Sequence, residues 1–308
     1  MYTPLPSALA AWQSRGRRVR VLGHEVFILD EGPKDDPEPL LVLHGFPSSG
    51  FDFHLALPRL STGRRVVIHD HIGFGLSDKP ERYSYSLHEQ ADAAIAVWRA
   101  LGIERGHLLA HDYGTSVATE LLARRAHNLL PISLSSVTLC NGSVHIELAH
   151  LTPSQRLLRS PIVGPLFARV ARPAIFKAQL RKILGHPASL SEEELDFMWT
   201  LMIRDGGKER LPAISGYLDE RVRFRHRWTA ALIAFDRPAH VLWGRLDPVA
   251  VPAIAERLST ELSRVRVTWL DRLGHYPMLE DAGAWSDAAL AFLDGLGKAG
   301  GEARGDGA

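Results

Sequence analysis

The residues with the clearest chemical potential lie in segment 107–118, HLLAHDYGTSVA. An apolar run ends at His111, Asp112 follows, and Gly114 opens a strongly apolar helical pattern. This pattern predicts a nucleophile elbow, a sharp strand-to-helix turn that presents its central side chain at the top of a sheet. Small residues such as Ala110 and Gly114 suit this turn because the backbones approach closely there.

An aspartate at the elbow predicts a different chemistry from the serine usually found there. Serine leads to an acyl ester, whereas aspartate attacks a saturated carbon and forms an alkyl ester. Asp112 therefore points to epoxide ring opening, halide displacement or a closely related reaction. The alternative for Asp112 alone is an N-cap that accepts a backbone N–H two or three residues on.

An aspartate nucleophile needs a base that activates water and a group that orients this base. His275 follows the last predicted strand, and Asp247 follows the strand before it. We expect His275 to deprotonate water and Asp247 to hold its other ring nitrogen. The chain order Asp112, Asp247, His275 is that of hydrolases built on this elbow.

The negative charge that develops during ester hydrolysis needs preorganised donors. His44-Gly-Phe-Pro47 follows a predicted strand, and its glycine lets the backbone turn so that the Phe46 N–H points inward. Together with the Tyr113 N–H it is predicted to form an oxyanion hole.

The elements that must position these residues alternate between strand and helix patterns, which predicts an α/β fold with a mostly parallel, doubly wound sheet of eight strands. From 143 to 234 the pattern is helical only, so we expect a core of 1–142 and 235–298, an inserted cap of 143–234 and a disordered tail of 299–308. The expected strands are 18–22, 25–29, 40–43, 66–68, 108–111, 137–140, 239–243 and 265–270, and the main core helices are 87–101, 117–126, 254–262 and 285–296.

Bulk composition predicts a soluble cytoplasmic protein with a small-molecule substrate. The net charge of +1 gives no reason to expect nucleic acid or an anionic membrane as a partner. Cys140 is the only cysteine, the start of the chain lacks a signal-peptide pattern, and no apolar run approaches the ~20 residues of a membrane span. His69-Asp-His71 lacks further ligands at metal-binding spacing, so neither a metal nor a cofactor is implied.

The motifs together resemble the α/β-hydrolase superfamily, and within it the epoxide hydrolase and haloalkane dehalogenase branch. Several stretches are similar to the mesoderm-specific transcript protein group and its bacterial members. The resemblance covers about 18–296, and its main motifs are His44-Gly-Phe-Pro47, His69-Asp-His-Ile-Gly-Phe-Gly-Leu-Ser-Asp78, His111-Asp-Tyr-Gly114, Phe224-Arg-His-Arg-Trp228, Gly244-Arg-Leu-Asp247 and His275-Tyr-Pro-Met-Leu-Glu280.

Departures from these families decide between the reactions that the resemblance implies. Haloalkane dehalogenases hold the halide with a tryptophan after the nucleophile and commonly an asparagine after the His-Gly pair; here these positions are Tyr113 and Phe46. Epoxide hydrolases usually protonate the leaving oxygen with two cap tyrosines. The cap contains only Tyr217, and Arg221 stands at the matching position one turn later.

Other candidate substrate contacts are His44, Arg221 and Trp199. The run 221–227 is rich in arginine and is by default a solvated helix face, but Arg221 or Arg225 facing inward would bind a carboxylate or assist the leaving oxygen. We therefore expect an epoxide hydrolase-like enzyme acting on an apolar substrate with an electrophilic carbon. The alternatives are haloalkane dehalogenation by the same aspartate and a hydrolase-fold protein that binds without turnover.

Overall fold

A computed structural model describes the chain from residue 5 to residue 302. Its centre is one eight-stranded sheet in the order β1-β2-β4-β3-β5-β6-β7-β8. The pairs β1·β2 and β2·β4 are antiparallel and all other pairs are parallel, which confirms the predicted fold class. The strands are β1 (Arg17–Val21), β2 (His24–Glu31), β3 (Leu40–Leu43), β4 (Val66–His69), β5 (Arg105–His111), β6 (Ser133–Cys140), β7 (Ala239–Gly244) and β8 (Val265–Leu270).

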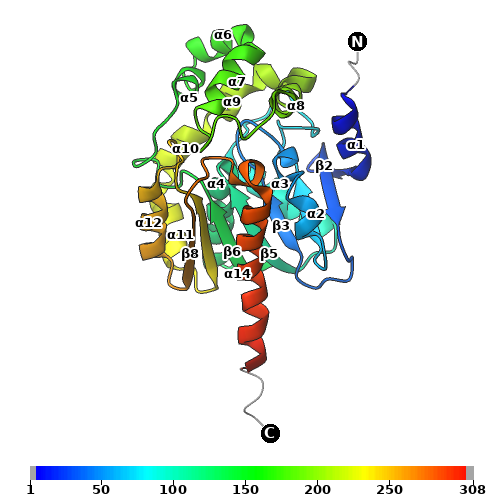
Figure 1. The fold of residues 1–308 in the computed structure, drawn as a ribbon, viewed down its shortest axis with the longest axis vertical. Helices are drawn as coiled ribbons and strands as arrows, with labels where there is room; N and C mark the ends of the chain where they lie inside the picture. Colours follow the sequence, from blue (N-terminus) through cyan, green and yellow to red (C-terminus); the bar gives the residue numbers. More distant parts are fainter. Residues whose placement is uncertain (1–4, 303–308) are drawn as a thin grey trace.

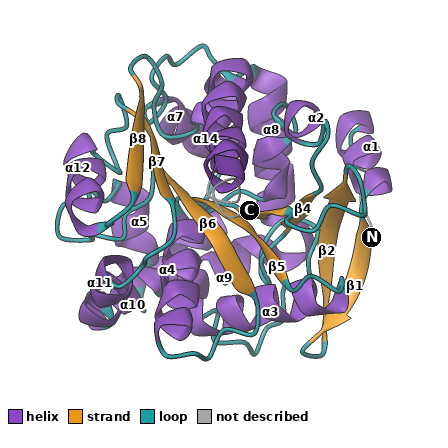
Figure 2. Cartoon of the chain, turned by 90° about the horizontal axis from the view of Figure 1, so that it is seen from below, coloured by secondary structure: helices purple, strands orange, loops and turns teal. Residues whose placement is uncertain are grey.

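Helices cover both faces of the sheet, with α14 on one side and α3, α4 and α11 on the other (Figure 2). Strand β3 shows why its sequence is a continuous apolar run. Leu41 and Leu43 join one buried cluster, whereas Leu40 and Val42 join the other. Successive side chains of a strand point to opposite faces, so a strand covered on both sides is apolar throughout. The helices and short 3₁₀ turn of the core are α1 (Ser7–Arg15), η1 (Gly50–Phe53), α2 (Leu57–Leu60), α3 (Leu87–Ala100), α4 (Tyr113–Ala126), α12 (Pro252–Glu261), α13 (Pro277–Glu280) and α14 (Ala282–Glu302).

The segment between β6 and β7 contains only helices, which lie above the carboxyl ends of the parallel strands (Figure 1). The exception to this placement is α11, which packs against α4 beside the sheet. None of the helices in the described part of the chain is long and apolar enough to cross a membrane. The helices and short 3₁₀ turn between β6 and β7 are α5 (Pro153–Leu158), α6 (Val163–Val170), α7 (Pro173–Arg181), α8 (Glu192–Ile203), η2 (Arg204–Gly206), α9 (Gly207–Ile214), α10 (Tyr217–Arg223) and α11 (Arg225–Ile233).

Two ends of the chain differ from the sequence-based prediction. Helix α1 was not predicted, and it forms because Leu9 and Trp12 are buried against the core. Helix α14 continues to Glu302 instead of ending at Leu296, so it includes the first residues of the predicted disordered tail; residues 303–308 lie outside the described residues. The extension contains no proline, and an established helix adds one hydrogen bond for each further residue.

Candidate active site

Asp112 occupies the turn between β5 and α4 with φ 42° and ψ −108°. Positive φ is rare for residues other than glycine, and such strain persists only where the surroundings enforce it. Gly114 permits the turn, since a Cβ on it would lie 2.5 Å from the Leu43 carbonyl oxygen. The Asp112 side chain makes no capping hydrogen bond to α4, so the N-cap alternative is wrong.

The Asp112 carboxylate lies between a backbone donor and a buried cation. Its Oδ2 accepts a hydrogen bond of 2.9 Å from the Phe46 N–H, and its Oδ1 lies 3.8 Å from the Arg221 guanidinium. Arg221 is fully buried; its Nε donates to the Ser116 hydroxyl at 2.7 Å, and its guanidinium lies 4.5 Å from the centre of the Tyr217 ring. Arg221 is thus held as a counter-ion for Asp112.

Only part of the arginine-rich run follows the default expectation of a solvated face. Arg223 and Arg225 are exposed, whereas Arg221 faces the elbow. Arg221 does not line the cavity described below, and its guanidinium lies beside the Asp112 carboxylate.

Asp247 and His275 form a buried pair, with Nδ1 of the histidine 2.7 Å from Oδ2 of the aspartate. Asp247 is itself fixed, because its Oδ1 accepts from the N–H groups of Val249 and Ala250 at 2.7 and 3.0 Å. The contact with Nδ1 leaves Nε2 as the ring nitrogen available to water. The structure therefore brings together the base and the orienting carboxylate that the sequence predicts.

Asn141 is a member of this site that the sequence analysis missed. Its Nδ2 donates to Oδ2 of Asp247 at 2.8 Å, and its amide group also bonds to the backbone N–H and C=O of Gly244. Asn141 directly follows β6 and has φ 42°, a conformation that asparagine tolerates better than most residues. The position of Asn141 directly after a parallel strand is the feature of the sequence that could have identified it as a site residue.

The pKa of His275 results from two opposing effects. Burial lowers it, while the charge and hydrogen bond of Asp247, the Asp112 charge and the Glu280 charge raise it, with a net rise from 6.5 to about 9. His275 is consequently protonated at neutral pH when Asp112 is a carboxylate.

Backbone contacts hold the loop that carries His275. Glu280 accepts from the N–H groups of Gly274 and Gly185 at 3.0 and 2.6 Å, and Nε2 of His111 donates to the His275 carbonyl at 2.7 Å. Burial lowers the pKa of His111 to about 4, so this histidine stays neutral and its role is to position the loop.

The two N–H groups of the predicted oxyanion hole belong to Phe46 and Tyr113. The Phe46 N–H already binds the carboxylate, and the Tyr113 N–H belongs to the first residue of α4, where an amide has no partner within its own helix. Position 45 must be glycine, because a Cβ there would lie 2.8 Å from Nδ1 of His111. This arrangement can stabilise negative charge on an Asp112 ester.

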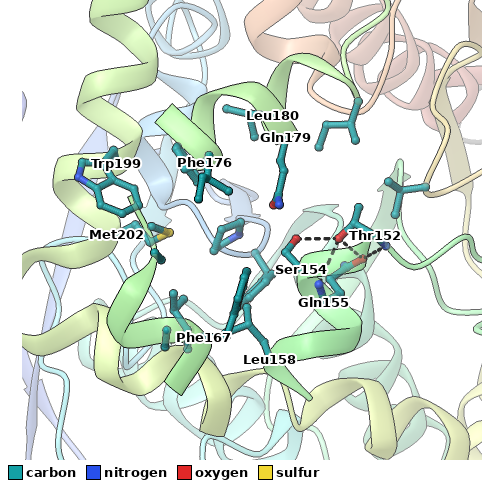
Figure 3. A pocket seen from close by; sticks show the side chains of 18 of the residues that line it. Thr152, Ser154, Gln155, Leu158, Phe167, Phe176, Gln179, Leu180, Trp199 and Met202 are labelled. Atoms are coloured by element: carbon teal, nitrogen blue, oxygen red, sulfur yellow. Dashed lines mark hydrogen bonds between the residues drawn. The ribbon is translucent and has the colours of Figure 1, made fainter. Parts of the chain in front are cut away.

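A cavity of about 110 Å³ lies between the cap and these groups. Phe46, His275 and Tyr276 line its core side, and apolar side chains from α5 to α9 line most of the remainder (Figure 3). The polar side chains shown at its wall are Thr152, Ser154, Gln155 and Gln179. An apolar wall with a few polar groups is typical of small-molecule sites.

The predicted substrate contacts divide into those that reach this cavity and those that do not. Trp199 lines it, as predicted. His44 lies elsewhere: it is fully buried, its Nε2 accepts from the His71 N–H at 3.0 Å, and burial lowers its pKa to about 4. His44 therefore supports the loop after β4, because both of its ring nitrogens already bond to the backbone.

Tyr217 and Asp112 lie just outside the cavity lining. The Tyr217 hydroxyl accepts a hydrogen bond of 3.1 Å from Nε2 of Gln155, which does line the cavity. The Tyr217 ring lies 5.5 Å from that of Phe46, another lining residue. Tyr217 is thus connected to the cavity through two of its wall residues.

The sheet order, the helical insertion and the elbow define an α/β hydrolase. The chain belongs to this family: the alpha/beta hydrolase fold family matches residues 38–282. It is 40% identical over 282 residues to the "Putative hydrolase LipZ" of Mycobacterium tuberculosis (strain ATCC 25618 / H37Rv), covering 92% of this chain and 96% of that protein. It is also 35% identical over 298 residues to the mesoderm-specific transcript homolog protein of Homo sapiens, covering 94% of this chain and 89% of that protein.

Solved structures share this fold at lower sequence identity. The haloalkane dehalogenase DbeA from Bradyrhizobium elkani USDA94 superposes with a TM-score of 0.76 at 24% identity, covering 92% of this chain and 99% of that chain. The predicted resemblance to the α/β-hydrolase superfamily and to the mesoderm-specific transcript group is confirmed. The fold and the hydrolase-named relative together support a hydrolase.

Proposed function

We propose that this chain is an epoxide hydrolase-like enzyme that uses Asp112 as a nucleophile. The observation that supports this most strongly is the strained Asp112, whose carboxylate accepts from the Phe46 N–H beside the Asp247–His275 pair. The cavity that would hold the substrate is lined by Phe46 and His275, and the Phe46 N–H donates to the Asp112 carboxylate. The reacting group of the substrate is an electrophilic saturated carbon on an apolar body.

In the first step, an Asp112 oxygen forms a bond to an epoxide carbon and the C–O bond of the ring breaks. The leaving alkoxide takes a proton from Tyr217. Burial, followed by the Asp112 charge, raises the pKa of Tyr217, so the phenol keeps its proton until a strong base such as an alkoxide forms. Gln155 donates to the phenol oxygen and stabilises the resulting phenolate.

In the second step, His275 must become neutral before it can act as a base. Ester formation removes the negative charge of Asp112, one of the charges that raise the pKa of His275. The proton of His275 passes through water to the Tyr217 phenolate, which regenerates the phenol. Neutral His275 then takes a proton from the attacking water, and the Phe46 and Tyr113 N–H groups bind the oxyanion.

The tetrahedral intermediate collapses to an Asp112 carboxylate and a diol. The carboxylic proton moves to the departing alkoxide, so the cycle ends with protonated His275 and neutral Tyr217, as it began. The net reaction adds one water molecule to one epoxide. Dehalogenation receives less support, because Tyr113 and Phe46 stand at the positions where haloalkane dehalogenases carry the tryptophan and asparagine that hold the halide.

The test is intact-protein mass spectrometry of His275→Ala after incubation with separate panels of epoxides and haloalkanes. Without its base the variant should form the ester and hydrolyse it slowly, which gives a mass gain equal to the whole epoxide. Peptide mapping should place the adduct on Asp112, and the double variant His275→Ala/Asp112→Asn is the matched control. An alkyl gain with halide release would indicate dehalogenation instead, and no adduct with either panel would reject the proposal for these substrates.

A further inference from the structure

The outer surface of α5–α7 exposes an unusual amount of apolar side chain. On α6, Leu166 is 63% exposed and Val170 is 58% exposed, and Ile162 just before the helix is 86% exposed. Val163, Leu166 and Val170 follow i, i+3, i+7 spacing, so they form one stripe. We call this surface the cap apolar patch; its members are Leu157, Ile162, Val163, Leu166, Val170 and Ile175.

The same segment is strongly basic although the chain as a whole is almost neutral. Residues 148–191 contain no aspartate or glutamate and seven basic residues: Arg156, Arg159, Arg169, Arg172, Lys177, Arg181 and Lys182. Arg159, Lys177 and Arg181 pair with carboxylates of α8 and α10. Arg156, Arg169 and Arg172 are exposed and have no carboxylate partner within the described part of the chain.

We propose that the cap apolar patch and these three arginines dock on the surface of an anionic lipid bilayer. An apolar helix face flanked by arginine is the composition of segments that lie in a membrane interface. Exposed arginine adds attraction to anionic headgroups, while the apolar stripe enters the boundary of the acyl chains. The whole-chain charge of +1 concealed this feature, because the acidic residues lie in other parts of the sequence.

The docking surface connects with the cavity. Ile175 belongs to the patch, is 46% exposed and also lines the cavity, and Arg172 lines it too. Phe167 and Ala168, on the inner side of α6, form part of the same wall. Helix α6 lies at the outer end of the molecule (Figure 1), so a bilayer can approach it without contacting the sheet. The docking surface and the cavity wall thus share Ile175 and Arg172.

The test measures binding of the full chain to vesicles by flotation, using phosphatidylcholine with a quarter phosphatidylglycerol against phosphatidylcholine alone. We expect binding to the anionic vesicles only, weakened by added salt. The variant Arg156→Gln/Arg169→Gln should reduce the partition coefficient by about 25-fold, or about fivefold per arginine. The variant Ile162→Ser/Leu166→Ser/Val170→Ser should reduce it by about tenfold or more.

Matched controls place the same number of substitutions on other exposed positions: Arg20→Gln/Arg99→Gln for charge, and Leu22→Ser/Leu129→Ser/Ile233→Ser for apolar area. Both control variants should bind as the wild type does. Absence of binding to anionic vesicles, or equal losses in control and patch variants, would overturn the proposal. Light scattering without vesicles tests whether a second copy of the chain covers the patch instead of a bilayer. A dimer that the triple serine variant abolishes would assign the patch to self-association and overturn the proposal. Docking does not depend on catalysis, so Asp112→Asn should bind vesicles normally.

Discussion

Replacing His275 by glutamine should change how the free energy of unfolding depends on pH. The pKa of His275 is about 9 in the folded chain against an ordinary value of 6.5. A difference of roughly 2.5 pKa units corresponds to roughly 3 kcal/mol of stability. Because the folded value is the higher one, this contribution is fully present below pH 6.5 and is lost as the pH rises through about 9.

The measurement is urea-induced unfolding of the wild type and His275→Gln at several values between pH 6 and pH 10. Only the difference between the two proteins is informative, because Lys79 has the opposite effect. Burial lowers the pKa of Lys79 to about 8, so its contribution to stability rises with pH, but it is present in both proteins. The wild-type advantage should fall by roughly 3 kcal/mol across this range.

The matched control is His127→Gln, at an exposed histidine. Its difference from the wild type should stay small and vary little with pH. If the His275→Gln difference were also flat, His275 would be neutral in the folded chain at pH 7. That result would refute the coupling between His275 and its carboxylate neighbours, and with it the proton inventory proposed for the reaction.

Three further substitutions test separate parts of the site. Tyr217→Phe should slow ester formation by about 10²–10⁴-fold in single-turnover experiments, because it removes the proton donor. It should also lower the free energy of unfolding by about 1–3 kcal/mol, because Nε2 of Gln155 loses its buried acceptor; equal rates would exclude Tyr217 as the acid. Asn141→Ala should lower the free energy of unfolding by about 1–3 kcal/mol in urea, since the Asp247 side chain loses a buried donor; an unchanged value would contradict its anchoring role. Gly114→Ala should lower the free energy of unfolding by about 1–3 kcal/mol and lower the melting temperature, because the added methyl group would lie 2.5 Å from the Leu43 carbonyl oxygen. Gly283→Ala is the control and should be tolerated, because its added methyl group would lie 3.4 Å from the nearest atom.

The core of the site could be predicted from the sequence because its residues follow parallel strands. Asp112, Asp247 and His275 each come after a short apolar run, and the carboxyl ends of parallel strands meet at one edge of the sheet. A local pattern therefore implies proximity between residues that are far apart in the chain. Asn141 obeys the same rule after β6, but no local pattern shows that its amide holds Asp247.

The cap could not be predicted to the same depth. Helical periodicity shows that a segment is amphipathic, but it does not show which neighbour covers each face. Arg221 is buried while Arg223 and Arg225 are exposed, and the difference arises from Ser116 and Asp112, which lie more than a hundred residues earlier. The pairing of Tyr217 with a glutamine of α5 is equally tertiary in origin.

The burial of Arg221 explains why His275 should be the group that changes its protonation during the reaction. At rest, the carboxylates of Asp112 and Asp247 are balanced by Arg221 and protonated His275. In the proposed reaction, ester formation would remove the Asp112 charge and leave an excess positive charge in a buried site, which is costly. Arginine does not lose its proton in proteins, so His275 must lose the proton. In the proposed mechanism, alkylation of Asp112 thereby produces the base that the next step requires, and this base stays inactive until there is an ester to hydrolyse.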